Sequence, residues 1–163
     1  MLALLASINI AVSFGTSGSR FAGATVDASD VLSLRAGWSF EVRELYLRGE
    51  VAALNRNCAS AYLYAFQDCV SSKLLAVGIR RLIGGVLGLA VELGAGTATG
   101  SATTGFDRGV SVTGTAAVPG TSLDIRLPVG ATMDVRFGVG SSLWLLSPIL
   151  IQYRAEIGLG ANF

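Results

Sequence analysis

Apolar and polar residues alternate along much of the chain. Between Leu123 and Val139 every odd-numbered residue is apolar, whereas the even-numbered residues are charged, threonine, glycine or proline. The same alternation runs from Ile149 to the terminal Phe163. Side chains of a β-strand point alternately to its two faces, whereas a helix would scatter these residues around its circumference. The pattern therefore predicts strands.

Shorter segments have the same period, and they bring the number of predicted strands to eight. These segments are Leu4–Phe14, Leu32–Val42, Leu45–Ala53, Leu75–Ile79, Leu87–Ala95 and Val110–Val118. We expect Leu4–Phe14 to be the first strand and not a cleaved signal peptide, because no positive charge precedes Arg20 and its removal would leave an odd number of strands. A signal peptide is then expected upstream of this sequence.

The connections between these segments alternate between long and short. The long ones cover residues 15–30, 54–73, 97–108 and 140–148, and the short ones are Arg43-Glu44, 82–85 and 119–121. Short turns on one side and long loops on the other are typical of outer-membrane β-barrels. Pro128 cannot donate a hydrogen bond within a sheet, so it indicates either a bulge in an overlong seventh strand or a turn that changes the strand count.

Composition narrows the function classes. Hydrophobic residues make up 52% of the 163 residues and charged residues only 14%, which excludes a disordered chain. A net charge of +1 gives no basic surface for nucleic acid. The chain has no histidine, the commonest general base and metal ligand, and no metal-ligand spacing. We therefore expect no enzyme, no cofactor and no metal.

The charged residues avoid the apolar face of the predicted strands. A charge on the lipid face at mid-bilayer would cost roughly 2–4 kcal/mol, so lipid contact predicts this exclusion. A soluble barrel or sandwich remains the alternative, but it would usually carry more lysine than the single Lys73. The charges on the less apolar face are Arg35, Glu41, Arg48, Glu50, Arg80, Glu92, Asp124, Arg126, Asp134, Arg136, Arg154 and Glu156.

These twelve residues are six arginines and six acids, and they face one lumen in the predicted barrel. An eight-stranded barrel is just wide enough for side chains to fill it. We expect a plugged, charge-paired interior, and the protein is then a structural or surface-interaction barrel. The alternative is a narrow pore or transporter for ions or small amphiphilic molecules.

The end of the chain carries the most specific pattern. Tyr153, Ile157, Leu159 and terminal Phe163 lie on one face of the last predicted strand, as in the assembly signal of outer-membrane proteins. The chain here resembles the small bacterial outer-membrane β-barrels of the eight-stranded OmpA and OmpX class. The resemblance implies an all-β, transmembrane, antiparallel up-and-down barrel, with residues 1–163 forming one domain. It also implies contact with outer-membrane lipid, insertion by the barrel-assembly machinery, and a monomer.

Both cysteines, Cys58 and Cys69, fall in the loop predicted over residues 54–73. In an oxidising cell envelope we expect them to form a disulfide, and two free thiols are the alternative in a reducing compartment. Tyr62, Tyr64 and Phe66 lie between them. These aromatic residues are either part of the girdle at the membrane boundary or a loop contact for a partner.

Overall fold

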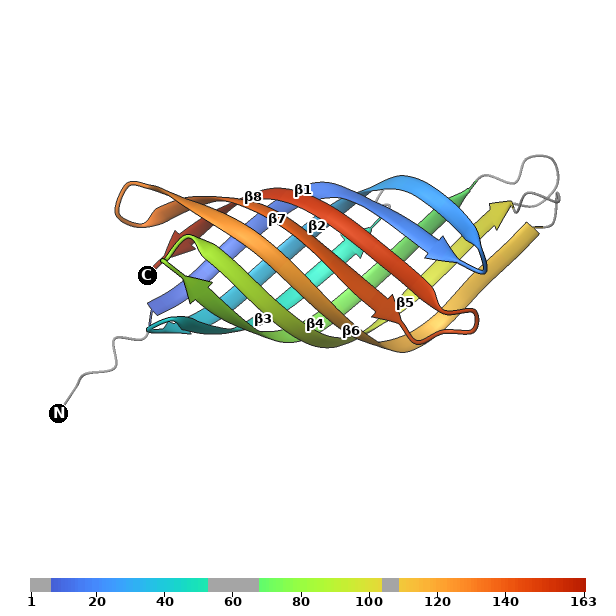
Figure 1. Ribbon diagram of the computed structural model, residues 1–163, viewed down its shortest axis with the longest axis horizontal. Helices are drawn as coiled ribbons and strands as arrows, with labels where there is room; N and C mark the ends of the chain where they lie inside the picture. Colours follow the sequence, from blue (N-terminus) through green and yellow to red (C-terminus); the bar gives the residue numbers. More distant parts are fainter. Residues whose placement is uncertain (1–6, 53–67, 104–108) are drawn as a thin grey trace.

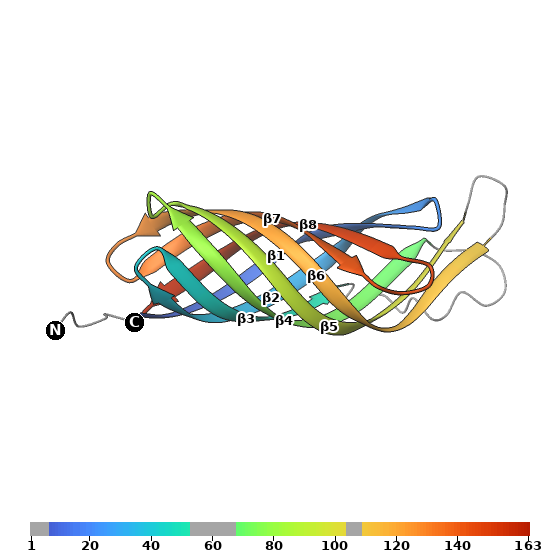
Figure 2. The ribbon, with the colours of Figure 1, turned by 60° about the horizontal axis from the view of Figure 1, so that its bottom comes forward.

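The computed structural model shows a closed barrel of eight antiparallel strands (Figures 1 and 2). The structure describes residues 7–52, 68–103 and 109–163. In these ranges there is no helix that is long and apolar enough to cross a membrane. The strands are β1 (Ser7–Phe21), β2 (Ala24–Phe40), β3 (Arg43–Ala52), β4 (Cys69–Ile83), β5 (Leu87–Thr103), β6 (Gly109–Val129), β7 (Met133–Trp144) and β8 (Leu150–Asn162).

Each strand pairs with its neighbours in sequence, and β1 closes the barrel against β8. This closing register runs from Asn9, opposite Asn162, to Phe21, opposite Leu150. Closure leaves no sheet edge along the paired region, which is the condition for strands to cross a bilayer. The predicted all-β antiparallel barrel of eight strands is confirmed.

The two ends of the barrel differ in the segments that they gather. Strand β1 begins and β8 ends at one end, where the turns that join β2 to β3, β4 to β5 and β6 to β7 also lie (Figure 1). We call this the turn end. The opposite end carries the connection from β1 to β2 and the segment from Leu145 to Ile149, which joins β7 to β8. We call it the loop end.

The turn predicted over residues 119–121 is wrong. Residues 119–121 lie inside β6, where Pro119 pairs with Leu93 of β5 and Gly120 pairs with Ser142 of β7. The chain reverses instead at residues 130–132, so the segment Leu123–Val139 belongs to two strands. Pro128 lies in β6 opposite Asp134, close to this turn, so a turn and not a bulge follows it, but this turn does not change the strand count. The strand count stayed at eight because one turn was replaced by another.

Several strands are longer than predicted, and their connections are correspondingly shorter. Residues 15–30 form most of a hairpin that turns at Ala22 and Gly23, both of which have positive φ angles. The hairpin predicted at Arg43-Glu44 turns at Glu41 and Val42 instead. Strand β5 extends through most of the loop predicted over residues 97–108, and β7 extends into the loop predicted over 140–148.

The exterior changes in character from the turn end to the loop end. Toward the turn end, every strand exposes large apolar side chains on the outer surface, for example Phe14, Leu34, Val91 and Ile157. We call this surface the apolar belt. On β5 and β6 near the loop end, small hydroxyl residues replace it. This hydroxyl rim consists of Thr97, Thr99, Ser111, Thr113 and Thr115.

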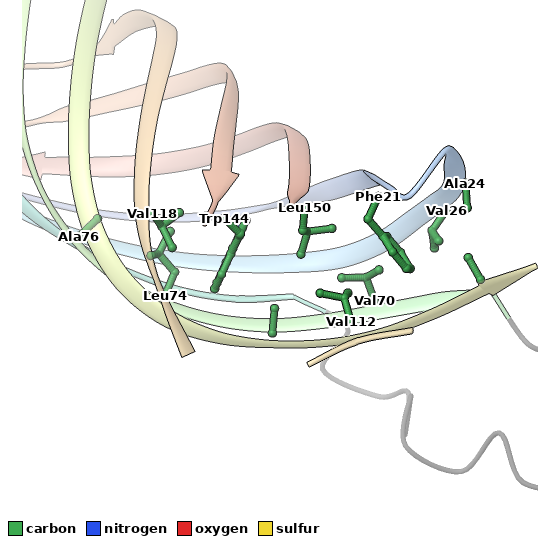
Figure 3. Close-up of a cluster of buried hydrophobic side chains, with 12 residues drawn as sticks. Phe21, Ala24, Val26, Val70, Leu74, Ala76, Val112, Val118, Trp144 and Leu150 are labelled. Atoms are coloured by element: carbon green, nitrogen blue, oxygen red, sulfur yellow. The ribbon is translucent and has the colours of Figure 1, made fainter. Parts of the chain in front are cut away.

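The interior near the loop end is apolar. Its side chains come from strands around the barrel and pack against one another (Figure 3). Trp144 and Leu150 have no solvent-exposed surface. We call this cluster the apolar cap; it comprises Phe21, Ala24, Val26, Val70, Leu74, Ala76, Ala98, Ala102, Val112, Val118, Trp144 and Leu150.

Candidate functional site

The remaining interior, between the apolar cap and the turn end, is filled with charged side chains. Six arginines and six acidic residues point inward there, so their formal charges sum to zero. We call this set the ion-pair network; it comprises Arg35, Glu44, Arg48, Glu50, Arg80, Glu92, Asp124, Arg126, Asp134, Arg136, Arg154 and Glu156.

Arg48 is at the centre of the first group of contacts. Its side chain is completely buried and forms ion pairs with Glu50 of the same strand and Glu92 of β5. The Nε atom of Arg48 donates to Oε2 of Glu92 at 3.0 Å. Arg154 of β8 approaches the same two acids, with its Nη2 atom 3.4 Å from Oε1 of Glu92 and its Nε atom 3.6 Å from Oε2 of Glu50. Two arginines therefore share two acids across the barrel.

Glu44 organises a second group, nearer the turn end. Its carboxylate, which is fully buried, accepts hydrogen bonds from Arg80 of β4 and from Arg126 of β6. Asp124 lies against the same two arginines, with its Oδ1 atom 2.9 Å from Nε of Arg80 and its Oδ2 atom 3.5 Å from Nε of Arg126. This group is again two arginines with two acids.

Tyr46 connects the two groups. The guanidinium of Arg35 lies 4.8 Å from the centre of its ring and that of Arg80 lies 4.9 Å away. The tyrosine hydroxyl donates to Glu92 at 2.7 Å. Gly78 is opposite Tyr46 in the register, and a Cβ atom there would collide with the ring. Glycine at this position therefore provides the space that the aromatic ring occupies.

A smaller polar group closes the interior at the turn end. Arg136 forms an ion pair with Asp134, two residues away on the same face of β7. Asn162 donates to Asp134 at 3.2 Å and accepts a hydrogen bond from Asn9 at 2.6 Å. These contacts join β7 to the seam where β8 meets β1.

A layer of neutral hydrogen bonds separates the ion-pair network from the apolar cap. The indole Nε1 of Trp144 donates to Oε1 of Gln152 at 3.2 Å. The amide nitrogen of Gln152 donates to Ser72 at 3.2 Å and to Ser17 at 3.4 Å. One glutamine side chain thus contacts three other strands at the level where the interior changes from charged to apolar.

One member of the predicted charge set was wrong, and one was missed. Glu41 lies in the turn between β2 and β3, is exposed and has a positive φ angle of 54°. Glu44 takes a place in the network that Glu41 was expected to hold. The available signal was the alternation itself, because counting back by twos from Glu50 through Arg48 and Tyr46 reaches Glu44. The misplaced hairpin at Arg43-Glu44 concealed it.

The other predicted site residues lie in three places. Cys58, Tyr62, Tyr64 and Phe66 fall outside the described residues, so their disulfide and contact roles remain predictions. Cys69 is buried at the start of β4. The residues of the predicted assembly signal, Tyr153, Ile157, Leu159 and Phe163, all point outward and are more than half exposed.

The arrangement leaves little room for water beside the central charges. The side chains of Arg48, Arg80 and Glu44 have 0% exposure, which means that no water-sized space adjoins them. Among the residues that the structure describes, no group of three or more possible ligands is placed to hold a metal ion. The geometry is that of a packed, ion-paired interior.

Solved structures of bacterial barrels resemble this one over nearly their whole length. Neisserial surface protein A has a TM-score of 0.67 at 8% sequence identity, with 96% of this chain and 97% of that chain covered. Ail, the attachment invasion locus protein of Yersinia pestis, has a TM-score of 0.64 at 16% identity, with 97% and 99% covered. The chain has the fold of the small eight-stranded outer-membrane β-barrels.

A third solved structure has the same fold at a greater structural distance. The N-terminal β-barrel domain of OprF from Pseudomonas aeruginosa has a TM-score of 0.50 at 16% identity, with 94% of this chain and 97% of that chain covered. A scan against protein-family models finds no match for the chain, and a search of curated proteins finds none either. At these identities the similarity concerns the fold.

Proposed function

We propose that this protein is an integral outer-membrane barrel whose interior is closed, and that it serves as a structural or surface-interaction protein. The observation that carries the proposal is the reversal of polarity between the two surfaces of the same strands. Toward the turn end the barrel exposes large apolar side chains to its surroundings and buries its arginines and acids. A protein surrounded by water gains nothing from such an arrangement, whereas one surrounded by lipid requires it.

Outer-membrane location is supported by the neighbours as well as by the apolar belt. Ail is an outer-membrane protein of Yersinia pestis and has been solved in a phospholipid bilayer nanodisc. On this basis the partners of the present chain are outer-membrane lipid and, during insertion, the barrel-assembly machinery. The outward row that begins at Tyr153 of β8 and ends at Phe163, directly after this strand, is the segment proposed to be recognised by that machinery. A closed barrel with no unpaired seam also supports a monomer.

The closed interior supports a role without transport. A conducting path would leave its lining side chains in contact with water, yet the central arginines are fully buried and paired. The apolar cap then fills the loop end of the same lumen. The interior acids are occupied by arginines, so they also support a role without catalysis.

Two measurements test the proposal. The full chain, expressed with an outer-membrane signal peptide, is expected in the outer-membrane fraction and to migrate differently on a gel before and after boiling. In planar bilayers it is expected to give no steady openings. Recovery in the soluble fraction without detergent would overturn the membrane assignment. Steady ion conductance, lost on substitution of Arg48 or Glu92, would instead establish the narrow pore.

A further inference from the structure

The apolar belt contains a groove that crosses five strands. It is a shallow, open hollow of about 880 Å³ on the outer surface of β4 to β8. Its walls are apolar: Ile79, Leu89, Val91, Leu123 and Val139.

The groove follows two adjacent rows of residues across the sheet. In one row, the register places Ile79 beside Val91, then Thr121, then Ser141, and finally Tyr153. Thr121 and Ser141 are small, and their hydroxyl oxygens lie 3.3 Å apart, within hydrogen-bond distance. The hollow lies where these two short side chains stand between larger neighbours.

An arginine pair stands at the turn-end extremity of the groove. Arg81 lines the groove, and Arg43 of β3 is directly opposite Arg81 in the register. Both side chains point outward and are exposed. Neither forms an ion pair with any acid in the described part of the chain, and like charges directly opposite one another destabilise a sheet. An anion between the two guanidinium groups would remove that repulsion.

We infer that this groove binds one anionic phospholipid of the periplasmic leaflet, with its phosphate between Arg43 and Arg81 and one acyl chain along the groove. The inference rests on the proposed membrane location, which puts the turn end at the periplasmic side. Arginine guanidinium groups bind phosphate oxygens through paired, charge-assisted hydrogen bonds. The apolar walls supply the complementary surface for the chain.

The dimensions of the groove fit a chain of one leaflet. Four strand spacings separate β4 from β8, which is about 19 Å along the row. Strands of such barrels are tilted by about 45°, so the groove rises about 13 Å along the membrane normal. Half of a hydrocarbon core of about 30 Å is about 15 Å. A lipid held at Arg81 would thus reach close to the bilayer midplane.

Native mass spectrometry tests the inference on the full barrel, released from nanodiscs of phosphatidylcholine with a minor fraction of phosphatidylglycerol. The unmodified protein is expected to retain one phosphatidylglycerol, and the double variant Arg43→Gln/Arg81→Gln about tenfold less. The matched control is Arg20→Gln, because Arg20 is also exposed and outward but lies near the loop end of β1. It should retain the lipid as the unmodified protein does.

Two further arms separate the lipid from other sources of phosphate and charge. Excess inorganic phosphate should not displace the lipid, and Ser141→Leu, which fills the groove floor, should reduce retention with both arginines present. Equal retention by the double variant, or an equal loss in Arg20→Gln, would overturn the inference. A boiled-versus-unboiled gel on each variant reports insertion, so a failure of the membrane proposal is seen separately.

Discussion

The turn-end and loop-end halves of the barrel place apolar and polar side chains on opposite surfaces of the same strands. The turn-end half has an apolar exterior and a charged interior, and the loop-end half has hydroxyl side chains outside on β5 and β6 and an apolar cap inside. The first pattern suits lipid outside, and the second is that of a barrel in water. A strand that crosses a bilayer needs about 9–11 residues, whereas β5 has 17 and β6 has 21. The excess length carries the second pattern.

The apolar side chains of one strand can therefore change from its outer face to its inner face while the strand continues without a bulge. On β6 even-numbered residues point inward throughout: Val112 and Val118 belong to the apolar cap, and Asp124 and Arg126 belong to the ion-pair network. Only the chemistry of the inward residues changes. The variants below test this division, beginning with the largest expected effect.

Removal of one buried charge should be the most damaging change. Arg48→Met removes one of the two arginines that Glu50 and Glu92 share and leaves these acids with Arg154 alone, so we expect the free energy of unfolding to fall by about 3–5 kcal/mol. Urea unfolding in lipid vesicles, followed by tryptophan fluorescence, measures it. The double variant Arg48→Met/Glu50→Gln should cost less than Arg48→Met alone. Additive losses would show that the two side chains are not coupled.

A charge placed on the exterior should distinguish the two halves directly. Ile157 is outward in the apolar belt, and Ile157→Arg should lower the free energy of unfolding in lipid by about 2–4 kcal/mol. Thr113→Arg, outward in the hydroxyl rim, should change it by about 0.5 kcal/mol or less. Insertion yield and urea titration measure both. If the two arginines cost the same, the rim is not outside the lipid.

Exchanging valine and threonine at adjacent positions tests the loop-end half from both sides. Val112→Thr places a hydroxyl among apolar side chains and should cost about 1–3 kcal/mol. Thr113→Val removes only an exposed contact with Thr99 and should stay within about 0.5 kcal/mol. The same unfolding assay applies. The reverse ranking would mean that the faces of β6 are assigned incorrectly.

Among the interior charges, the smallest effect is expected at Arg35. It is the member of the ion-pair network for which the described residues supply no carboxylate partner, and its visible contact is the ring of Tyr46. Arg35→Met keeps an apolar contact with the ring, so we expect a loss of about 0.5–1 kcal/mol. Measured beside Arg48→Met, it ranks an unpaired interior arginine against a paired one. A loss as large as that of Arg48→Met would contradict the assignment of pairs.

The barrel and its strand count could be predicted from the two-residue alternation of apolar and polar residues, but the turn after β6 could not. The valines of segment 110–118 occupy even positions and the apolar residues of 123–139 occupy odd positions. If the more apolar face of every strand is taken to be the outer face, these two segments can be combined only by a turn between them. Residues 119–121, with their proline and glycine, offer such a turn. In the structure, the even-numbered residues of β6 point inward along the whole strand, and the interior that they enter changes from apolar to charged. For this reason Thr113, although it lies on the less apolar face of segment 110–118, points outside.

The inward position of most charges could also be predicted, but their pairing could not. The alternation places Arg126 inside the barrel but does not give its partner, Glu44, which lies 82 residues away in sequence. Glu156 lies 3.0 Å from Arg154 and accepts a hydrogen bond from Ser33. Contacts across a lumen depend on the curvature and stagger of the closed sheet, and a single sequence does not specify these.

The unbroken phase of β6 also limits how its length can change in evolution. One residue inserted near Gly120 would turn every side chain on one side of it to the opposite face. Arg126 and Asp124 would then point into lipid, and Leu123 and Ile125 would point into the charged lumen. Two inserted residues would keep every side chain on its present face and would only lengthen the strand. Insertions and deletions in this strand should therefore be accepted in even numbers of residues. Substitutions, in contrast, can move the level along β6 at which the inward side chains change from apolar to charged.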